Sequence, residues 1–105
     1  MKLSCLFIGL GGAGQRHLRL FKDYFGENIQ LLAFRSKSTT PLLNADFSVN
    51  ESENLECYYN LRLFSTLETA LNEKPTYVVI CTPTSHHISC AIQAARTGAH
   101  ILLEK

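Results

Sequence analysis

The motif that organises this chain is Phe7-Ile8-Gly9-Leu10-Gly11-Gly12-Ala13-Gly14, a G-x-G-x-x-G spacing that stands directly between an apolar run and an amphipathic run. Gly9 suits a tight turn, Gly11 lets the backbone approach a pyrophosphate, and Gly14 lets the following helix pack on its strand. The N–H groups and positive dipole end of that helix would face the anion. The alternative is a structural turn without a ligand. The residues predicted to contact a dinucleotide here are Gly9, Gly11, Gly12, Ala13 and Gly14.

Apolar runs alternate with helical patterns along the rest of the chain. Residues 3–8 and 29–34 read as buried strands, and residues 12–25 as the crossover helix between them, with Gly26 at its end. Residues 38–60 are polar and irregular, and no helix is placed there. Three further strands are predicted, at 61–64, 77–81 and 100–103. A helix over 65–73 starts with a capping box in Ser65-Thr66-Leu67-Glu68. In the last predicted helix, which ends at Gly98, the residues expected to pack inward are Ile88, Ala91, Ile92 and Ala95. This order predicts an α/β fold, a doubly wound parallel sheet.

Composition excludes several classes of partner. The 105 residues carry 18% charged side chains and a formal net charge of +1, so no basic field favours nucleic acid or an anionic membrane surface. No apolar run approaches the roughly 18 residues that a membrane span needs. The four cysteines form no C-x-x-C pair and have no histidine at metal spacing, so we expect reduced, partly buried thiols and no metal site. Without an export signal or a disulfide pattern, a cytoplasmic location is expected.

The end of the second predicted strand bears on the choice of cofactor. The acidic residue that would bind a ribose 2′-hydroxyl is missing there, and Arg35, Ser36 and Lys37 stand in its place. A guanidinium can stack on adenine and pair with a 2′-phosphate, and a hydroxyl and an ammonium would complete the cradle. This favours NADP over NAD, with NAD still possible; the alternative is an ordinary solvated basic turn.

Four motifs together resemble the N-terminal domain of the glucose-fructose oxidoreductase, inositol dehydrogenase and rhizopine catabolism family (Gfo/Idh/MocA), from end to end of the chain. They are the glycine loop followed by Gln15-Arg16-His17-Leu18, Thr82-Pro83-Thr84-Ser85-His86-His87, Gly98-Ala99-His100, and Glu104-Lys105, which is similar to the start of the family's E-K-P signature. The resemblance implies that residues 1–105 are one NAD(P)-binding domain with a Rossmann-like fold. It also implies a second domain beyond Lys105, with most of the substrate pocket and a homo-oligomer interface.

The resemblance also implies roles for residues near the nicotinamide. Thr82 and Pro83 would line the cofactor, and the alternative for Pro83 and Thr84 is helix initiation alone. His87 would lie near the nicotinamide, or else be a structural histidine. Glu104 would contact the ribose, or else be a solvated charge at a strand end. Lys105 would be the catalytic residue that polarises a hydroxyl or carbonyl and relays its proton. We expect His17 and His100 to be structural.

These observations predict the nucleotide-binding domain of an NAD(P)-dependent oxidoreductase, one that moves a hydride between the nicotinamide and a secondary alcohol or carbonyl of a sugar-like substrate. The preference for a sugar or nucleotide sugar rests on resemblance. Two alternatives stay open. The chain is a non-catalytic module that binds cofactor without turnover, or it binds a different adenine nucleotide. A gene product that extends beyond Lys105 would favour catalysis, and a stop codon after Lys105 would favour the module.

Overall fold

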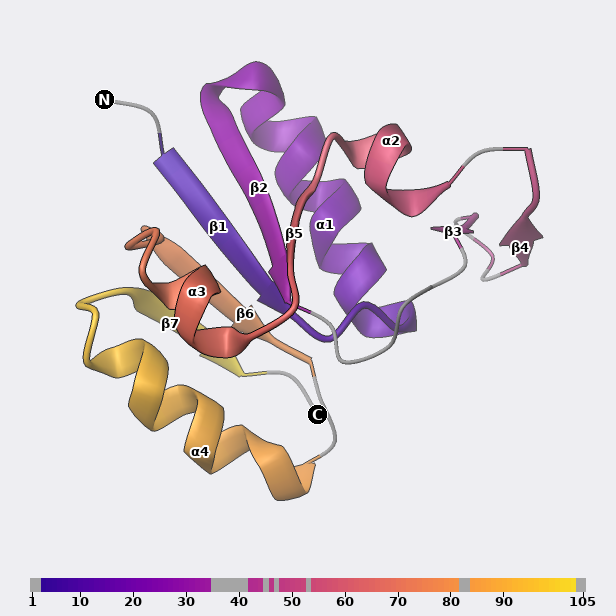
Figure 1. Cartoon of the computed structure of the whole chain (residues 1–105). Coiled ribbons are helices and arrows are strands. Elements are labelled where there is room, and N and C mark those ends of the chain that lie inside the picture. The colour runs from indigo at the N-terminus through magenta and orange to yellow at the C-terminus, as the bar shows by residue number, and fades with distance from the viewer. Residues whose placement is uncertain are drawn as a thin grey trace.

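A five-stranded parallel sheet forms the centre of the molecule, in the order β5-β2-β1-β6-β7 (Figure 1). The structure is a computed structural model of the chain, and it describes residues 3–34, 42–44, 46, 48–52, 54–81 and 84–103, without the side chains of Glu56 and residues 84–87. The strands are β1 (Leu3–Ile8), β2 (Ile29–Phe34), β5 (Arg62–Phe64), β6 (Tyr77–Ile80) and β7 (His100–Leu103). The chain runs outward from β1 to one side and then crosses to the other, which is the predicted doubly wound topology.

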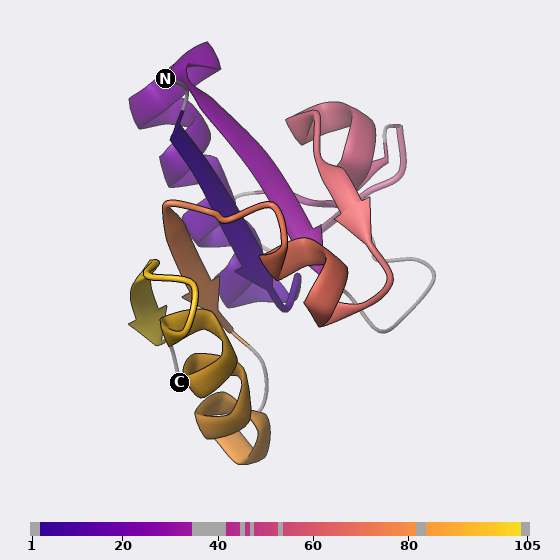
Figure 2. The same ribbon diagram turned by 60° about the vertical axis from the view of Figure 1, so that its left-hand side comes forward.

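Helices cover both faces of this sheet, because alternate residues of each strand point to opposite faces (Figure 2). Cys5 and Phe7 of β1 lie in the apolar cluster beneath α1 (Gly12–Phe25) and α2 (Leu55–Tyr59). Leu6 and Ile8 lie in the cluster beneath α3 (Leu67–Leu71) and α4 (Thr84–Ala95). The near-continuous apolar run of β1 therefore has a core on each side, as a central parallel strand requires.

The first three elements begin and end where the sequence predicted. β1, α1 and β2 have the expected bounds, and α1 ends at Gly26, whose φ of 58° lies in the region that favours glycine. A short 3-10 turn (Gly26–Asn28) leads into β2. The strands expected at 61–64 and 77–81 are confirmed to within one residue, and the last strand is confirmed at His100–Leu103.

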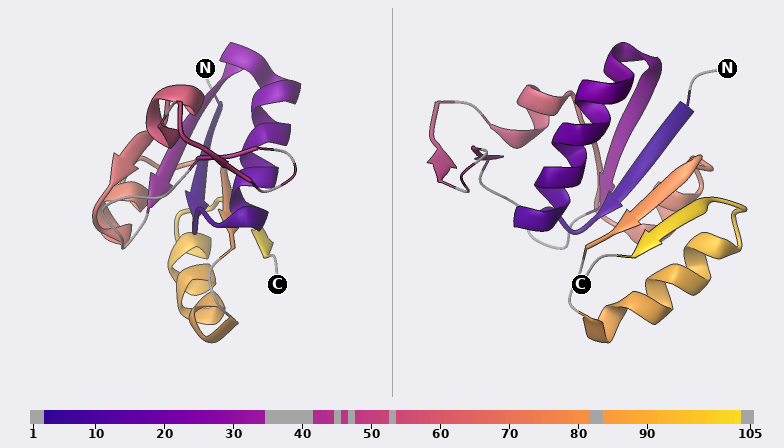
Figure 3. Two further views of the ribbon diagram at one scale, coloured as in Figure 1. Left: turned by 90° about the vertical axis from the view of Figure 1, so that its right-hand side faces the viewer. Right: turned by 180° about the vertical axis from the view of Figure 1, so that it is seen from behind.

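The segment between β2 and β5 contains more structure than the sequence predicted. It includes the antiparallel hairpin of β3 (Leu42–Leu43) and β4 (Val49–Asn50), followed by α2, and it packs beside α1 (Figure 3). Asn54 caps α2 by accepting a 2.8 Å hydrogen bond from the Cys57 amide, and Asn60, with φ 54°, follows its end. These two asparagines were the local signal for a helix that the irregular apolar pattern hid.

Helix α3 begins one residue later than its predicted capping box. Thr66, not Ser65, is the N-cap, and its hydroxyl accepts from the Thr69 amide at 3.2 Å. The helix ends at Leu71, before the expected residue 73, and Lys74 then adopts a φ of 52° ahead of Pro75. Both Ser65 and Thr66 suit an N-cap, so composition alone could not choose the register.

The inward face of α4 differs from the prediction. Of the four residues expected to face inward, Ala91 packs against the core, whereas Ile88 and Ile92 are 74% and 50% exposed and Ala95 is also exposed. Ala94 is fully buried instead, and Cys90 packs beside it. The small side chains let the helix approach the sheet closely, and the isoleucines point away. The spacing of apolar residues correctly indicated a helix but not which stripe faces the sheet.

Two further expectations concern cysteines and membranes. The four cysteines are free thiols; Cys5 is buried, but Cys57 is exposed, so the expectation of partial burial is wrong for Cys57. Among the described helices, none combines the length and apolarity needed to cross a membrane.

Candidate dinucleotide-binding site

The glycine loop joins the end of β1 to the start of α1 at the carboxyl edge of the sheet (Figure 1). Gly9 has a φ of 97°, a conformation that an L side chain rarely adopts, so the tight turn needs glycine there. The turn is anchored just before it, where the Ile8 carbonyl accepts a 2.8 Å hydrogen bond from the Cys81 amide. The predicted role of Gly9 is thus explained by backbone geometry alone.

Gly14 lets α1 lie directly against this turn. A Cβ placed on Gly14 would lie 2.2 Å from the Gly9 carbonyl oxygen, well inside the contact distance of real side chains. The atom in the way belongs to the backbone and cannot rotate aside. The third glycine of the motif therefore sets the close packing of helix on loop, as predicted.

Gly11 behaves differently, because none of the residues that the structure describes requires a glycine at that position. Its φ of −75° suits any residue, and a Cβ there would meet none of their atoms within 4 Å. Gly11 is also the N-cap of α1 and, having no side chain, makes no capping hydrogen bond to the N–H groups of the first turn. The first turn carries no acidic residue that would repel an anion. Open space, available N–H groups and a favourable dipole make this loop fit a pyrophosphate.

Gln15 is a residue of the site that the sequence analysis quoted without assigning it a role. It is a polar side chain only 1% exposed. Its Nε2 donates to the Leu10 carbonyl at 2.9 Å, and its Oε1 accepts from the Leu43 amide at 2.8 Å. The available signal was its position three residues before the buried Leu18, which puts a polar group on the inward face of α1.

Several predicted site residues lie outside the described part of the chain. They are Arg35, Ser36, Lys37, Thr82, Pro83, Glu104 and Lys105, together with the side chain of His87. The structure does place the strand ends that precede them. Phe34 pairs with Ile8, Ile8 with Ile80, and Ile80 with Leu103, so four neighbouring strands end at one edge. This is the edge where open α/β sheets bind ligands.

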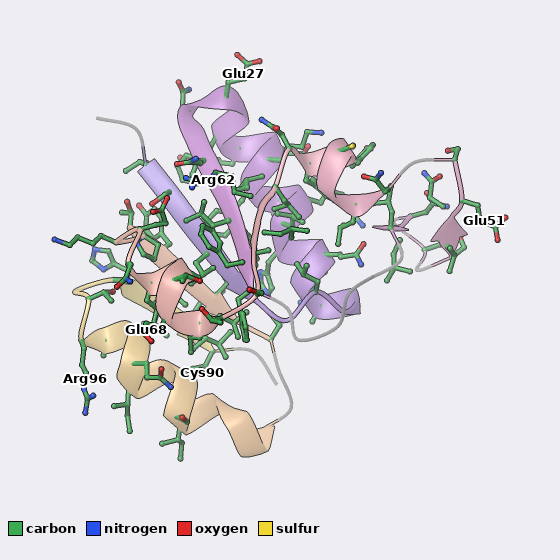
Figure 4. The ribbon with its side chains drawn as sticks, viewed as in Figure 1. Glu27, Glu51, Arg62, Glu68, Cys90 and Arg96 are labelled. Atoms are coloured by element: carbon green, nitrogen blue, oxygen red, sulfur yellow. The ribbon has the colours of Figure 1, made fainter. Side chains whose placement is uncertain are left out.

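Groups with a shifted pKa lie away from the glycine loop, within the described part of the chain. Burial raises the pKa of the Cys5 thiol, in the middle of β1, and that of Cys90 on α4 (Figure 4), so neither is an activated nucleophile. Burial also raises the pKa of Tyr59, against an opposing effect of Arg19. His100 lies at the start of β7, its ring 5.8 Å from that of Tyr77, which fits the structural role expected for it. The described residues contain no metal-binding cluster. The described part of the site is therefore suited to binding, not to acid–base chemistry.

Comparison with protein families gives one match to nearly the whole chain. The model described as "Oxidoreductase family, NAD-binding Rossmann fold" (GFO_IDH_MocA) matches residues 3–105. A search of curated protein sequences finds no match for the chain.

Solved structures with the same fold include several dehydrogenases. UDP-N-acetylglucosamine 3-dehydrogenase GnnA from Acidithiobacillus ferrooxidans is 27% identical over the whole chain, with a TM-score of 0.70, and the match covers 29% of that protein. The WlbA dehydrogenase from Bordetella pertussis, in complex with NADH and UDP-GlcNAcA, is 22% identical over the whole chain and 30% of its own, with a TM-score of 0.72. Biliverdin reductase from Synechocystis sp. PCC 6803, in complex with biliverdin and NADP+, is 21% identical over 98% of the chain and 29% of its own, with a TM-score of 0.73. The chain spans less than a third of the length of each.

Proposed function

Because the chain belongs to the Gfo/Idh/MocA oxidoreductase family with its NAD-binding Rossmann fold, we propose that it is the nucleotide-binding domain of an NAD(P)-dependent dehydrogenase. The observation that carries the proposal is Gly11, beside which the described residues leave open space and require no glycine unless a ligand approaches its backbone. The N–H groups at the start of α1 hold the pyrophosphate, and Gly9 and Gly14 hold those N–H groups in place.

NADP is the cofactor that the sequence favours. Arg35, Ser36 and Lys37 follow β2 directly, and β2 ends beside the strand that leads into the glycine loop. In that position a guanidinium, a hydroxyl and an ammonium bind a 2′-phosphate. The solved structures of this fold include complexes with NADH and with NADP+, so the fold leaves the choice to these side chains.

The proposed reaction is hydride transfer with a sugar-like secondary alcohol or carbonyl. A bound nicotinamide supplies the carbon that accepts or donates the hydride. Lys105 holds or donates the proton of the reacting oxygen, while Thr82, Pro83, His87 and Glu104 orient the nicotinamide half. The resemblance to GnnA, a UDP-N-acetylglucosamine 3-dehydrogenase, supports a nucleotide sugar as substrate.

The binding step is tested by fluorescence titration of the chain with NADPH and NADH in parallel. We expect tighter binding of NADPH, a preference that Arg35→Asp reverses. Arg96→Asp is the matched control, because Arg96 is an exposed cation just beyond α4, away from the glycine loop (Figure 4). Gly11→Ala should weaken both cofactors by at least about ten-fold, since its methyl group occupies the space of the phosphates. Wild-type chain that binds neither cofactor would contradict the proposal.

The reaction is tested on the complete gene product. Reduced nicotinamide should accumulate when the protein is given oxidised cofactor and a UDP-linked sugar, and Lys105→Met should abolish turnover with little change in cofactor affinity. Turnover that survives Lys105→Met would remove that residue from the chemistry. Cofactor binding with no turnover of any sugar would leave the non-catalytic module as the correct description.

A further inference from the structure

The buried amide of Gln15 joins two parts of the chain that are otherwise separate. On one side it donates to the Leu10 carbonyl, which directly precedes Gly11 in the glycine loop. On the other side it accepts from the amide of Leu43 in β3. One partner is an acceptor and the other a donor, so only one orientation of the side-chain amide satisfies both. The 1% exposure of Gln15 leaves water little access to replace either bond.

The hairpin that carries Leu43 is held together by hydrogen bonds of its own. Its two strands are joined by a turn in which the Asn44 amide donates to the Ser48 carbonyl at 2.8 Å. Asp46 accepts from the amide and the hydroxyl of Ser48 at 2.9 and 2.6 Å, which also lowers the pKa of its carboxyl. Leu42 is 3% exposed and belongs to the core beneath α1.

Helix α2 holds the other end of the segment between β2 and β5 against α1. Lys22 donates to the Tyr58 carbonyl at 2.9 Å, and its ammonium lies 4.4 Å from the centre of the Tyr58 ring. Leu55 and Tyr59 are buried in the shared core. The segment between β2 and β5 therefore contacts α1 through β3 and through α2 (Figure 3). The two hydrogen bonds of Gln15 link β3 to the glycine loop.

From this geometry we propose that Gln15 is a positioning residue of the nucleotide site. It fixes the Leu10 carbonyl and so holds the Gly11 backbone at the distance from α1 that a pyrophosphate requires. Gly11 depends on this support, because no atom of the described residues lies within 4 Å of the position that its Cβ would take. The inference rests on the proposed function, since it concerns the affinity of that same loop for a dinucleotide. It assigns the hairpin, which belongs to no predicted site, a part in binding.

The test compares dissociation constants of NADH and NADPH for wild-type chain, Gln15→Met, Leu43→Pro and the double variant. Methionine keeps the length of the side chain but makes neither hydrogen bond, and proline at 43 removes the bonded N–H while leaving Gln15 intact. We expect Gln15→Met to weaken both cofactors equally, by about ten-fold, because the loss of a buried hydrogen bond that orients the binding loop has an effect of about this size. Leu43→Pro should weaken both by a smaller factor, and the double variant should bind no worse than Gln15→Met.

Two further measurements separate positioning from a general loss of stability. Thr66→Ala removes the N-cap of α3 on the opposite face of the sheet, and it should lower stability without changing either dissociation constant. Amide hydrogen exchange at Leu43, whose N–H loses its acceptor, should accelerate in Gln15→Met while exchange in β6 stays unchanged.

The outcomes distinguish this inference from the proposed function. If wild-type chain binds a cofactor and Gln15→Met binds it equally well, the positioning role is wrong and the proposed function stands. If Gln15→Met changes the ratio of NADH to NADPH affinity, its effect is not on the shared pyrophosphate, and the inference is wrong. Wild-type chain that binds neither cofactor would overturn both.

Discussion

Replacing Gly14 by alanine should destabilise the fold through one backbone contact. The new Cβ would lie 2.2 Å from the Gly9 carbonyl oxygen, 0.8 Å short of the 3.0 Å that real side chains keep. Neither partner can yield easily, because Gly9 has a φ of 97° and the preceding Ile8 carbonyl is bonded to Cys81. Separating α1 from the end of β1 by that amount is an overpacking strain of about 3 kcal/mol. Alanine recovers about 1 kcal/mol through its better helix propensity.

The expected net loss is therefore about 2 kcal/mol of unfolding free energy. In a domain of this size, that lowers the melting temperature by roughly 10 °C. In urea it moves the unfolding midpoint down by about 1 M without a change in slope. Circular dichroism during thermal and urea unfolding measures both quantities on the same samples.

Gly11→Ala is the matched control for this prediction. The substitution is the same, it lies three residues away in the same loop, and the new methyl group meets nothing within 4 Å. Alanine is a poorer N-cap than glycine, which lowers stability, but it also restricts the unfolded chain, which raises stability. Because these two effects nearly cancel, the free energy of unfolding should change by no more than about 0.5 kcal/mol. If both variants lost equal stability, or Gly14→Ala lost none, the contact with Gly9 would not be what requires glycine at position 14.

Three further predictions test the core and the helix assignments. Burial raises the pKa of Cys5 above its ordinary 9.0, so above that pH only the unfolded chain releases the thiol proton, and the free energy of unfolding should fall by up to about 1.4 kcal/mol per pH unit. Urea midpoints measured between about pH 8 and pH 10.5 should show a smaller fall in Cys5→Val than in wild type. An unchanged pH dependence in the variant would exclude Cys5 as its source. On α4, Ala94→Leu should lower the free energy of unfolding by about 1 to 3 kcal/mol, and Ile88→Gln should lower it by less than about 0.5 kcal/mol. The reverse order in thermal unfolding would mean that the helix packs by its isoleucine face. At α3, Thr66→Ala should cost about 1 kcal/mol and Ser65→Ala almost nothing, and equal losses in urea would contradict the assigned N-cap.

The regular elements could be predicted because their signals are local. A continuous apolar run bounded by glycine specifies β1, and the apolar spacing from Gly12 to Phe25 with glycine beyond it specifies α1. The segment after β2 could not be predicted in this way. Of its buried residues, Leu55 and Tyr59 form a single i, i+4 pair, too short a pattern to predict a helix, and Leu42 stands 13 residues before Leu55. The three meet in the core beneath α1.

The sequence pattern also could not predict which face of α4 packs against the sheet. Two apolar stripes run along this helix, one through Ile88 and Ile92 and one through Cys90 and Ala94. Hydrophobic periodicity favours the stripe with the larger side chains, the isoleucines, as the buried one. In the folded chain the stripe of smaller side chains faces the sheet, with Ala94 fully buried and Cys90 packed beside it, while the two isoleucines are exposed.

By itself, the sequence determined the family, the doubly wound sheet and the glycine motif, because glycine spacing and apolar alternation act through the backbone close to each residue. Only the tertiary structure showed a different reason for glycine at each of the three positions. Gly9 has a positive φ, a Cβ on Gly14 would clash with the Gly9 carbonyl five residues earlier, and Gly11 borders open space among the described residues. The tertiary structure alone also brought Leu43 to Gln15, across 28 residues. Contacts of this kind depend on where separate segments meet in the folded chain, and no local preference records them.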